Sequence, residues 1–114
     1  MIAPVTPLSA RGRWEWSVEG EANHAGTTPM AGRRDALVRA AEFVLAARDE
    51  ALARPGAVAT VGRLAPWPGG TNVVPGRATG TLDARALDDS TRDDLVQALR
   101  ESFPDVATRA ITGS

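Results

Sequence analysis

His24 is the only histidine of the chain, and it lies in a segment whose residues favour exposure over packing. Gly26 follows two positions later, and the pair Thr28-Pro29 turns the backbone. An imidazole on such a loop can donate a hydrogen bond to a ligand or stabilise an oxyanion as negative charge develops. A loop histidine more often satisfies local backbone groups, but the small and hydroxyl-bearing neighbours favour a role towards a ligand. We therefore treat His24 as a candidate catalytic residue.

Two further side chains, Asn72 and Arg85, could bind a carboxylate. Arg85 lies on the polar side of an expected strand, and its planar guanidinium matches a carboxylate through two parallel hydrogen bonds. The alternative for Arg85 is a surface ion pair with Asp83 or Asp88, which contributes little to stability. The alternative for Asn72 is the start of a turn. Taken singly, each of the two residues is better explained by its structural alternative.

Several other chemistries are excluded by residue type. Gly69-Gly70-Thr71 has no helix after it and the chain contains no lysine, so this segment is not a phosphate-binding loop. Trp14 and Trp16 share one face of a strand, but acidic neighbours and a net charge of −1 argue against base stacking on a nucleic acid. Asp88-Asp89 is interpreted as a solvated pair that leads into a helix. One histidine and no cysteine cannot supply a zinc-type metal site.

The composition predicts one domain of 114 residues, large enough to bury a core. The absence of cysteine fits a reducing compartment. No apolar run reaches the roughly 20 residues of a membrane span, and the N-terminus lacks the regions of a signal peptide. These features predict a cytoplasmic protein that binds neither membrane nor nucleic acid.

The elements that must position the candidate residues follow from the spacing of apolar side chains. Residues 1–11 carry no periodicity and are interpreted as a lead-in segment, and residues 12–112 as the domain. Period-two alternation and β-branched residues predict strands, and a period near 3.6 predicts helices. The expected order is strand 13–19, helix 35–53, strand 57–64, strand 78–87, helix 90–103 and strand 106–111. This order predicts an α+β fold, a ferredoxin-like βαββαβ two-layer sandwich with a four-stranded antiparallel sheet and two helices on one face.

The two expected helices differ in how clearly their buried faces are marked. In the helix at 35–53, Arg48 falls inside the stripe expected to be buried, which is Leu37, Ala40, Ala41, Val44, Leu45, Ala51 and Leu52. In the helix at 90–103, Ser90 and Asp93 predict a capping box. The buried face of this second helix is expected to be Leu95, Val96, Leu99 and Phe103. The segment 66–70, rich in proline and glycine, is expected to break the preceding strand.

Three segments together resemble a known family. They are Gly20 to Met30 with Arg33 to Ala36, Thr71 to Gly76, and Thr81 to Arg85. Their sequence, order and spacing are similar to the lid, or dimerisation, domain of the aminoacylase and carboxypeptidase-like metallohydrolase superfamily. The form His-Ala-Gly-Thr-Thr-Pro-Met followed by Arg-Arg-Asp-Ala is most similar to the amidase branch. That branch includes N-carbamoyl-L-amino-acid hydrolases, β-ureidopropionases and allantoate amidohydrolases.

The resemblance implies a larger enzyme from which this domain is excised. A separate catalytic domain, divided in sequence around the lid, is expected to hold two divalent metal ions (Zn, Mn, Co or Ni) that activate the attacking water. The lid domains are expected to pair two subunits into a homodimer, and His24 to stabilise the tetrahedral intermediate in the neighbouring active site. Asn72 and Arg85 fall on lid residues that bind the carboxylate end of a small substrate. No cofactor is expected in this chain, and the isolated chain is expected to be inactive.

We therefore expect the lid and dimerisation domain of a metal-dependent amidohydrolase that cleaves a linear amide or carbamoyl C–N bond. The substrate would be an N-carbamoyl-L-amino acid, β-ureidopropionate or allantoate. One alternative is the lid of a related aminopeptidase, dipeptidase or N-acyl amino-acid deacylase. A second alternative, from another class, is a ferredoxin-like module that binds a small ligand or mediates assembly. Substrates carrying acyl or carbamoyl groups separate the first alternative from the expected activity.

Overall fold

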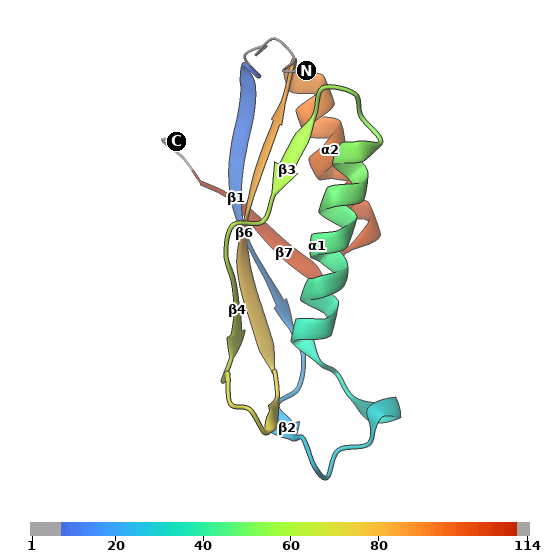
Figure 1. Cartoon of the computed structure of the whole chain (residues 1–114), viewed down its shortest axis with the longest axis vertical. Helices are drawn as coiled ribbons and strands as arrows, with labels where there is room; N and C mark the ends of the chain where they lie inside the picture. Colours follow the sequence, from blue (N-terminus) through green and yellow to red (C-terminus); the bar gives the residue numbers. More distant parts are fainter. Residues whose placement is uncertain (1–7, 112–114) are drawn as a thin grey trace, which may run out of the picture.

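Two long antiparallel strands form the centre of the molecule. The computed structural model of the chain describes residues 8–111. Strands β1 (Ala10–Glu19) and β6 (Arg77–Ala86) pair along their whole length (Figure 1). The alternation expected for both strands is confirmed, because every second residue of each is buried except Gly12 in β1, which is half-buried. Of the expected lead-in segment, residues 1–7 lie outside the described residues.

The remaining strands pair with the two outer sides of this central pair. β7 (Val106–Ala110) pairs with β1, while β3 (Val58–Thr60) and β4 (Leu64–Trp67) both pair with β6. All these pairs are antiparallel. The expected α+β class and antiparallel sheet are thus confirmed. Among residues 8–111 the main sheet has five strands and not the expected four, because the strand expected at 57–64 ends at Thr60 and a further strand begins at Leu64.

The division between β3 and β4 is a bulge in one edge of the sheet. Thr60 lies opposite Asp83 and Leu64 lies opposite Gly80, so the edge carries one residue more than its partner over this stretch. Pairing then resumes through residues 64–67, which the sequence analysis expected to be partly outside the strand. Proline is tolerated there because β4 is an edge strand, which does not need every backbone N–H for the sheet.

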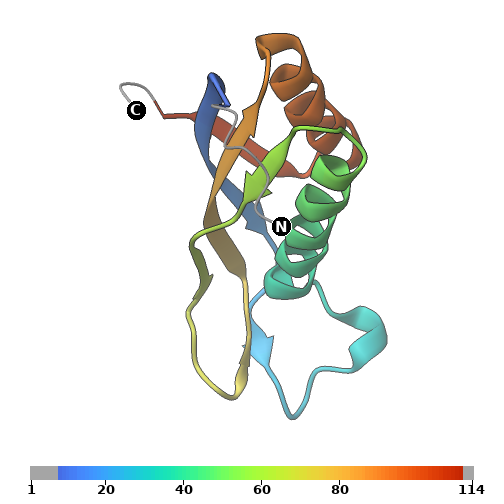
Figure 2. The ribbon, with the colours of Figure 1, turned by 45° about the horizontal axis from the view of Figure 1, so that its top comes forward.

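Helices α1 (Ala36–Leu52) and α2 (Asp89–Ser102) cover one face of the sheet (Figure 2). The centre of the core is aromatic: the ring of Phe43 on α1 lies 4.8 Å from the ring of Trp16 and 5.4 Å from that of Phe103. The face expected for α2 is confirmed, since Leu95, Val96, Leu99 and Phe103 are all buried. In the part of the chain that the structure describes, no helix covers the opposite face of the sheet.

The stripe expected to be buried on α1 is partly wrong. Ala41, Leu45 and Leu52 are exposed, whereas Phe43 and Ala47, which the expected stripe omitted, are buried. The helix is apolar on two overlapping stripes, and composition alone does not indicate which stripe meets the sheet. The observed buried stripe is Ala36, Ala40, Phe43, Ala47 and Ala51.

The start of α2 also differs from the expected capping box. Asp88 is the N-cap, and its carboxylate accepts a hydrogen bond of 2.7 Å from the backbone N–H of Thr91. The carboxylate of Asp88 also accepts a hydrogen bond from the hydroxyl of Ser90. The backbone N–H bond, aided by the serine hydroxyl, holds the pKa of Asp88 below its usual range. The pair Asp88-Asp89 is therefore a helix start, in agreement with the structural interpretation.

A second, smaller sheet extends the molecule beyond the helices. β2 (Asn23–His24) pairs with β5 (Val73–Val74), and a 3₁₀ turn, η1 (Met30–Gly32), leads from this end to α1. Figure 1 shows this small sheet at the foot of the molecule, below both helices. Among residues 8–111, no helix combines the length and the apolar character needed to cross a membrane.

Candidate functional site

His24 lies at the tip of the small sheet, at the start of a closely hydrogen-bonded turn. Its carbonyl accepts hydrogen bonds from the backbone N–H groups of Thr27 and Thr28, at 3.3 and 3.1 Å. The hydroxyl of Thr28 donates a third, of 2.7 Å, to the same carbonyl. The residue itself remains exposed. The backbone of His24 is therefore fixed while its side chain is exposed.

The hydrogen bonds of the imidazole assign its two nitrogens. Nδ1 of His24 accepts a hydrogen bond of 3.0 Å from the backbone N–H of Gly26. In a neutral imidazole one nitrogen accepts and the other carries the proton, so Nε2 is the donor. A Cβ at Gly26 would lie 3.1 Å from Cε1 of the ring, so a larger residue there would crowd the imidazole. The sequence segment thus builds an exposed N–H donor of fixed direction.

Asn72 is close to His24 because the two strands of the small sheet bring their loops together. The backbone N–H of Ala25 donates a hydrogen bond of 2.8 Å to the carbonyl of Asn72, and His24 lies opposite Val73. Asn72 is exposed, as is His24. Asn72 can be both a turn residue and a residue that faces a ligand. Only its backbone carbonyl is used in the contact with the turn around His24.

Arg85 lies far from the other two candidates. It stands eight residues along β6 from Arg77, and the small sheet with His24 begins beyond Arg77. At a rise of about 3.3 Å per residue, the backbones of Arg85 and His24 are separated by roughly 26 Å or more. The structure therefore brings His24 and Asn72 together and places Arg85 at a different position on the sheet.

Arg85 belongs to a charged cluster on the helix-free face. Its Nε and Nη2 donate to the two carboxylate oxygens of Asp83, at 2.8 and 3.2 Å, and Nε of Arg13 donates to Asp83 at 3.0 Å. The hydrogen bond from Arg85 and that from Arg13 hold the pKa of Asp83 below its usual range, against desolvation. The surface ion pair considered as the alternative is therefore present. It uses the Nε–Nη2 edge of the guanidinium, and within residues 8–111 Nη1 of Arg85 donates no hydrogen bond.

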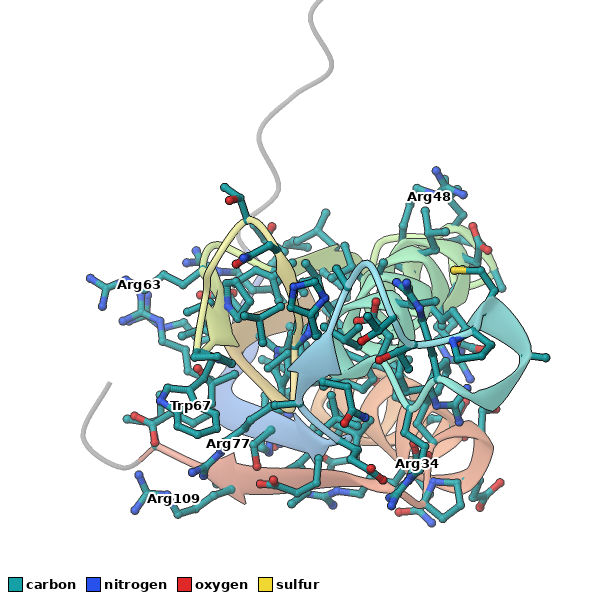
Figure 3. All side chains as sticks on the ribbon, turned by 90° about the horizontal axis from the view of Figure 1, so that it is seen from below. Arg34, Arg48, Arg63, Trp67, Arg77 and Arg109 are labelled. Atoms are coloured by element: carbon teal, nitrogen blue, oxygen red, sulfur yellow. The ribbon has the colours of Figure 1, made fainter. Side chains whose placement is uncertain are left out.

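A third feature is an exposed apolar seam on α1. Val38, Leu45 and Leu52 recur every seven residues, with Ala41 and Arg48 between them at a spacing of three and four. The exposed fractions of Val38, Leu45 and Leu52 are 56%, 50% and 77%. A stripe with this period is typical of a helix that packs against a second helix. Arg48, which the sequence placed in the apolar stripe, extends outward from α1 and contacts Asp49 (Figure 3).

The sheet edge beside this seam is also apolar. β3 and β4 form that edge, and they expose Val58, Leu64 and Trp67. Because α1 contacts β3, the seam lies beside the β3 part of this edge. Val58 and Trp67 lie opposite Arg85 and Arg77, so their side chains share the helix-free face. Exposed edge strands are able to pair with another chain. The α1 seam and the neighbouring β3–β4 edge are thus a candidate interface.

An open hollow of about 630 Å³ lies on the helix-free face, but none of the three candidate residues lines it. Arg63, Arg77 and Arg109 surround it, and Figure 3 shows them on the side of the molecule away from Arg48. Arg77 pairs with Glu19 at 3.2 Å, and Arg109 pairs with Glu15. Exposed ion pairs of this kind are typical of a sheet face in contact with water.

Two residues support the candidate side chains. The sequence predicts Asp83 as a surface partner of Arg85, because residues two apart on a strand share a face. Sequence reasoning missed the contact of Arg33 with the turn around His24, which no local pattern indicates. Among residues 8–111 no group of three His, Cys, Asp or Glu side chains could hold a metal ion. The described residues therefore do not fit the metal ions that the resemblance implies.

Comparison with known proteins finds relatives of the kind that the sequence resembles. Residues 9–109 match the family described as the peptidase dimerisation domain. The chain is 42% identical over 86 residues to an N-carbamoyl-L-amino-acid amidohydrolase of a Pseudomonas species, covering 74% of this chain and 21% of that protein. It is 39% identical over 104 residues to the allantoate amidohydrolase of Escherichia coli, covering 90% of this chain and 25% of that protein.

A solved structure has the same fold. An amidase of the hydantoinase/carbamoylase family from Burkholderia multivorans superposes with a TM-score of 0.84 at 34% identity, covering 89% of this chain and 27% of that one. The chain thus spans about a quarter of the length of the relatives it matches. The similarity concerns one domain of each of these longer proteins.

Proposed function

Because the chain belongs to the peptidase dimerisation domain family, we propose that it is the substrate-binding lid and dimerisation domain of a longer metal-dependent amidohydrolase. That enzyme hydrolyses a linear amide or carbamoyl C–N bond in an N-carbamoyl-L-amino acid, β-ureidopropionate or allantoate. The names of the relatives support this substrate class over peptides and N-acyl amino acids. Divalent metal ions belong to the remaining part of the enzyme, so the isolated chain is inactive. The lack of cysteine supports a cytoplasmic location.

His24 supplies a hydrogen-bond donor to the reacting carbonyl. The observation that carries this role is the bond from Gly26 to Nδ1, which leaves Nε2–H as an exposed donor at the tip of the domain. When the carbonyl oxygen gains negative charge, a fixed N–H donor stabilises it without reorganisation. Asn72 was expected with Arg85 at the carboxylate end, but it lies beside His24. We therefore assign its amide to the end of the substrate near the reacting carbonyl.

Arg85 binds the carboxylate of a substrate in a different active site from the one that His24 of the same chain serves. Side chains reach only about 6–7 Å from the backbone, so neither can bridge the separation of roughly 26 Å along the sheet. A small amino-acid derivative can therefore meet both groups only if they come from two subunits. Asp83 supports this role because it holds the guanidinium while leaving one edge free.

Dimerisation uses the α1 seam and the β3–β4 edge. The heptad spacing of Val38, Leu45 and Leu52 supports a helix–helix contact, and the neighbouring edge strand supports backbone pairing across the same boundary. In a twofold dimer the same side of each subunit faces the other. This arrangement holds the two domains side by side, so that the tip of one can extend towards the other subunit's active site.

Ammonia release by the metal-loaded parent enzyme tests the proposed activity directly. The substrates tested are N-carbamoyl-L-amino acids, β-ureidopropionate and allantoate. Dipeptides and N-acyl amino acids are tested separately as comparison substrates. His24→Ala is expected to lower kcat by roughly 100-fold with little change in KM, as for the loss of one oxyanion donor. Arg85→Ala is expected mainly to raise KM. Cleavage of dipeptides or acyl substrates without ammonia release would move the enzyme to the peptidase or deacylase alternative.

A further inference from the structure

One peptide unit beside His24 is held at both of its polar ends. The N–H of the Ala25–Gly26 peptide donates to Nδ1 of the His24 ring at 3.0 Å. The carbonyl of the same peptide accepts a hydrogen bond of 2.7 Å from Nη2 of Arg33. The ring of His24 and the guanidinium of Arg33 are therefore connected through a single planar group.

Arg33 also fixes the far end of the same turn. Its Nε donates to the carbonyl of Thr28 at 3.1 Å, so one guanidinium bridges the carbonyls of Ala25 and Thr28. Thr28 in turn holds the carbonyl of His24 through its hydroxyl and its backbone N–H. The contacts of Arg33 thus converge on both the backbone and the ring of His24.

Both acceptors of the Arg33 guanidinium are backbone carbonyls. Arginines such as Arg39 and Arg54 pair with carboxylates, at 2.8 Å in each case. Within residues 8–111, Arg33 forms no such ion pair, and its half-buried side chain donates to backbone carbonyls. The rigid fork of a guanidinium suits two carbonyls at a fixed separation, which a lysine ammonium matches less well. A charged donor on the carbonyl also polarises the peptide and strengthens its N–H as a donor.

We propose that Arg33 is a positioning residue for His24. By holding the Ala25–Gly26 peptide, it directs the Gly26 N–H at Nδ1 and so keeps the proton of the neutral ring on the outward Nε2. All the contacts that orient the ring are made by residues of this chain, so this part of the proposal does not depend on the parent enzyme. Its consequence for turnover rests on the proposed function, in which Nε2–H meets the reacting carbonyl.

The ring can be observed without interference, because His24 is the only histidine of the chain. The test is ¹⁵N NMR of the 114-residue chain, prepared without a histidine tag, at a pH where the ring is neutral. The wild type is expected to show an acceptor-type Nδ1 and a protonated Nε2. Hydrogen exchange of the Gly26 amide gives a second readout.

Arg33→Ala is expected to shift the Nδ1 resonance, to admit the other tautomer, and to accelerate exchange of the Gly26 amide. The acceleration should be about tenfold or more, because a hydrogen bond assisted by charge is worth at least this factor in an equilibrium. Arg34→Ala is the matched control, since Arg34 is the exposed neighbour, and it should change neither readout. Amides of the central strands report that each variant is folded.

Arg33→Lys provides a second variant should Arg33→Ala fail to fold. It keeps the charge but not the fork, and is expected to give intermediate values in both readouts. If a folded Arg33 variant leaves the Nδ1 resonance and the Gly26 amide as in the wild type, the proposal is overturned. The same result in Arg33→Ala and Arg34→Ala would overturn it as well.

The parent enzyme separates this inference from the proposed function. Arg33→Ala is expected to lower kcat by up to about 100-fold with little change in KM, as for a slightly misplaced catalytic group. In a His24→Ala background the same change should cause no further loss. A shifted ring signal with unchanged turnover would keep Arg33 as a positioning residue and overturn the catalytic role of His24.

Discussion

Replacement of Phe43 by alanine tests how α1 is rotated against the sheet, and this rotation decides which apolar stripe remains for a second subunit. Phe43 is 1% exposed and packs between Trp16 and Phe103. Leu45, two residues later, is 50% exposed. The sequence alone favoured Leu45 as the buried residue of the two, so the pair distinguishes the two rotations.

The expected cost of Phe43→Ala is about 3–5 kcal/mol in the free energy of unfolding, which combines lost burial with the cavity left behind. The ring contacts with Trp16 and Phe103, at 4.8 and 5.4 Å, place the value in the upper part of that range. For a domain of this size each kcal/mol lowers Tm by roughly 4 °C. Phe43→Leu keeps most of the volume and is expected to cost less than about 1.5 kcal/mol.

Urea denaturation followed by tryptophan fluorescence is the assay, because Trp16 lies against the substituted ring. The protein concentration is kept low so that association does not contribute. Leu45→Ala is the control and should change the free energy of unfolding by no more than about 0.5 kcal/mol. If Leu45→Ala were as destabilising as Phe43→Ala, the rotation of α1 and the assignment of the seam would both be refuted.

Three further predictions concern the interface, a carboxylate and a tight contact. Leu45→Asp removes about 1 kcal/mol of apolar burial from each subunit of the dimer. The dissociation constant of the parent dimer, measured by sedimentation, should therefore rise at least about 30-fold. An unchanged dissociation constant would place the interface elsewhere. The lowered pKa of Asp83, due first to Arg85, means that its stabilisation is present above the ordinary carboxyl value of 3.8 and is lost as the pH falls below it. Asp83→Asn should therefore be less stable by on the order of 1 kcal/mol at pH 7, with the two stability curves converging in acid, and parallel curves would contradict this. Gly20→Ala would place a Cβ 2.1 Å from the carbonyl oxygen of Arg34, so it should destabilise the domain by about 2–4 kcal/mol in the same denaturation assay.

The sequence predicted those parts of the fold that a local period determines. Strands β1 and β6 alternate cleanly between apolar and polar residues, so their buried faces were correctly predicted. α1 is rich in alanine on more than one side, and its buried stripe depends on the aromatic contact between Phe43 and Trp16, which is remote in sequence. The division between β3 and β4 depends on a bulge against β6, which no local pattern marks.

The candidate site shows the same division between local and long-range information. The exposure of His24 followed from its neighbours, and the Asp83–Arg85 pair followed from their spacing. The contact between Ala25 and Asn72 arises from a pair of two-residue strands, which are too short to give a periodic signal. The role of Arg33 depends on a side chain that reaches back to Ala25, and only the folded structure contains that contact.

The central claim is that one active site takes Arg85 from one subunit and His24 from the other. The direct measurement is the activity of the parent enzyme, at a substrate concentration well below the KM of the Arg85→Ala variant, when His24→Ala and Arg85→Ala subunits are allowed to exchange. Each mixed dimer then has one intact site, so random exchange should restore about a quarter of the wild-type activity in a twofold dimer. If the activity of the mixture stays at the level of the separate variants, both groups act from the same chain and the account is contradicted.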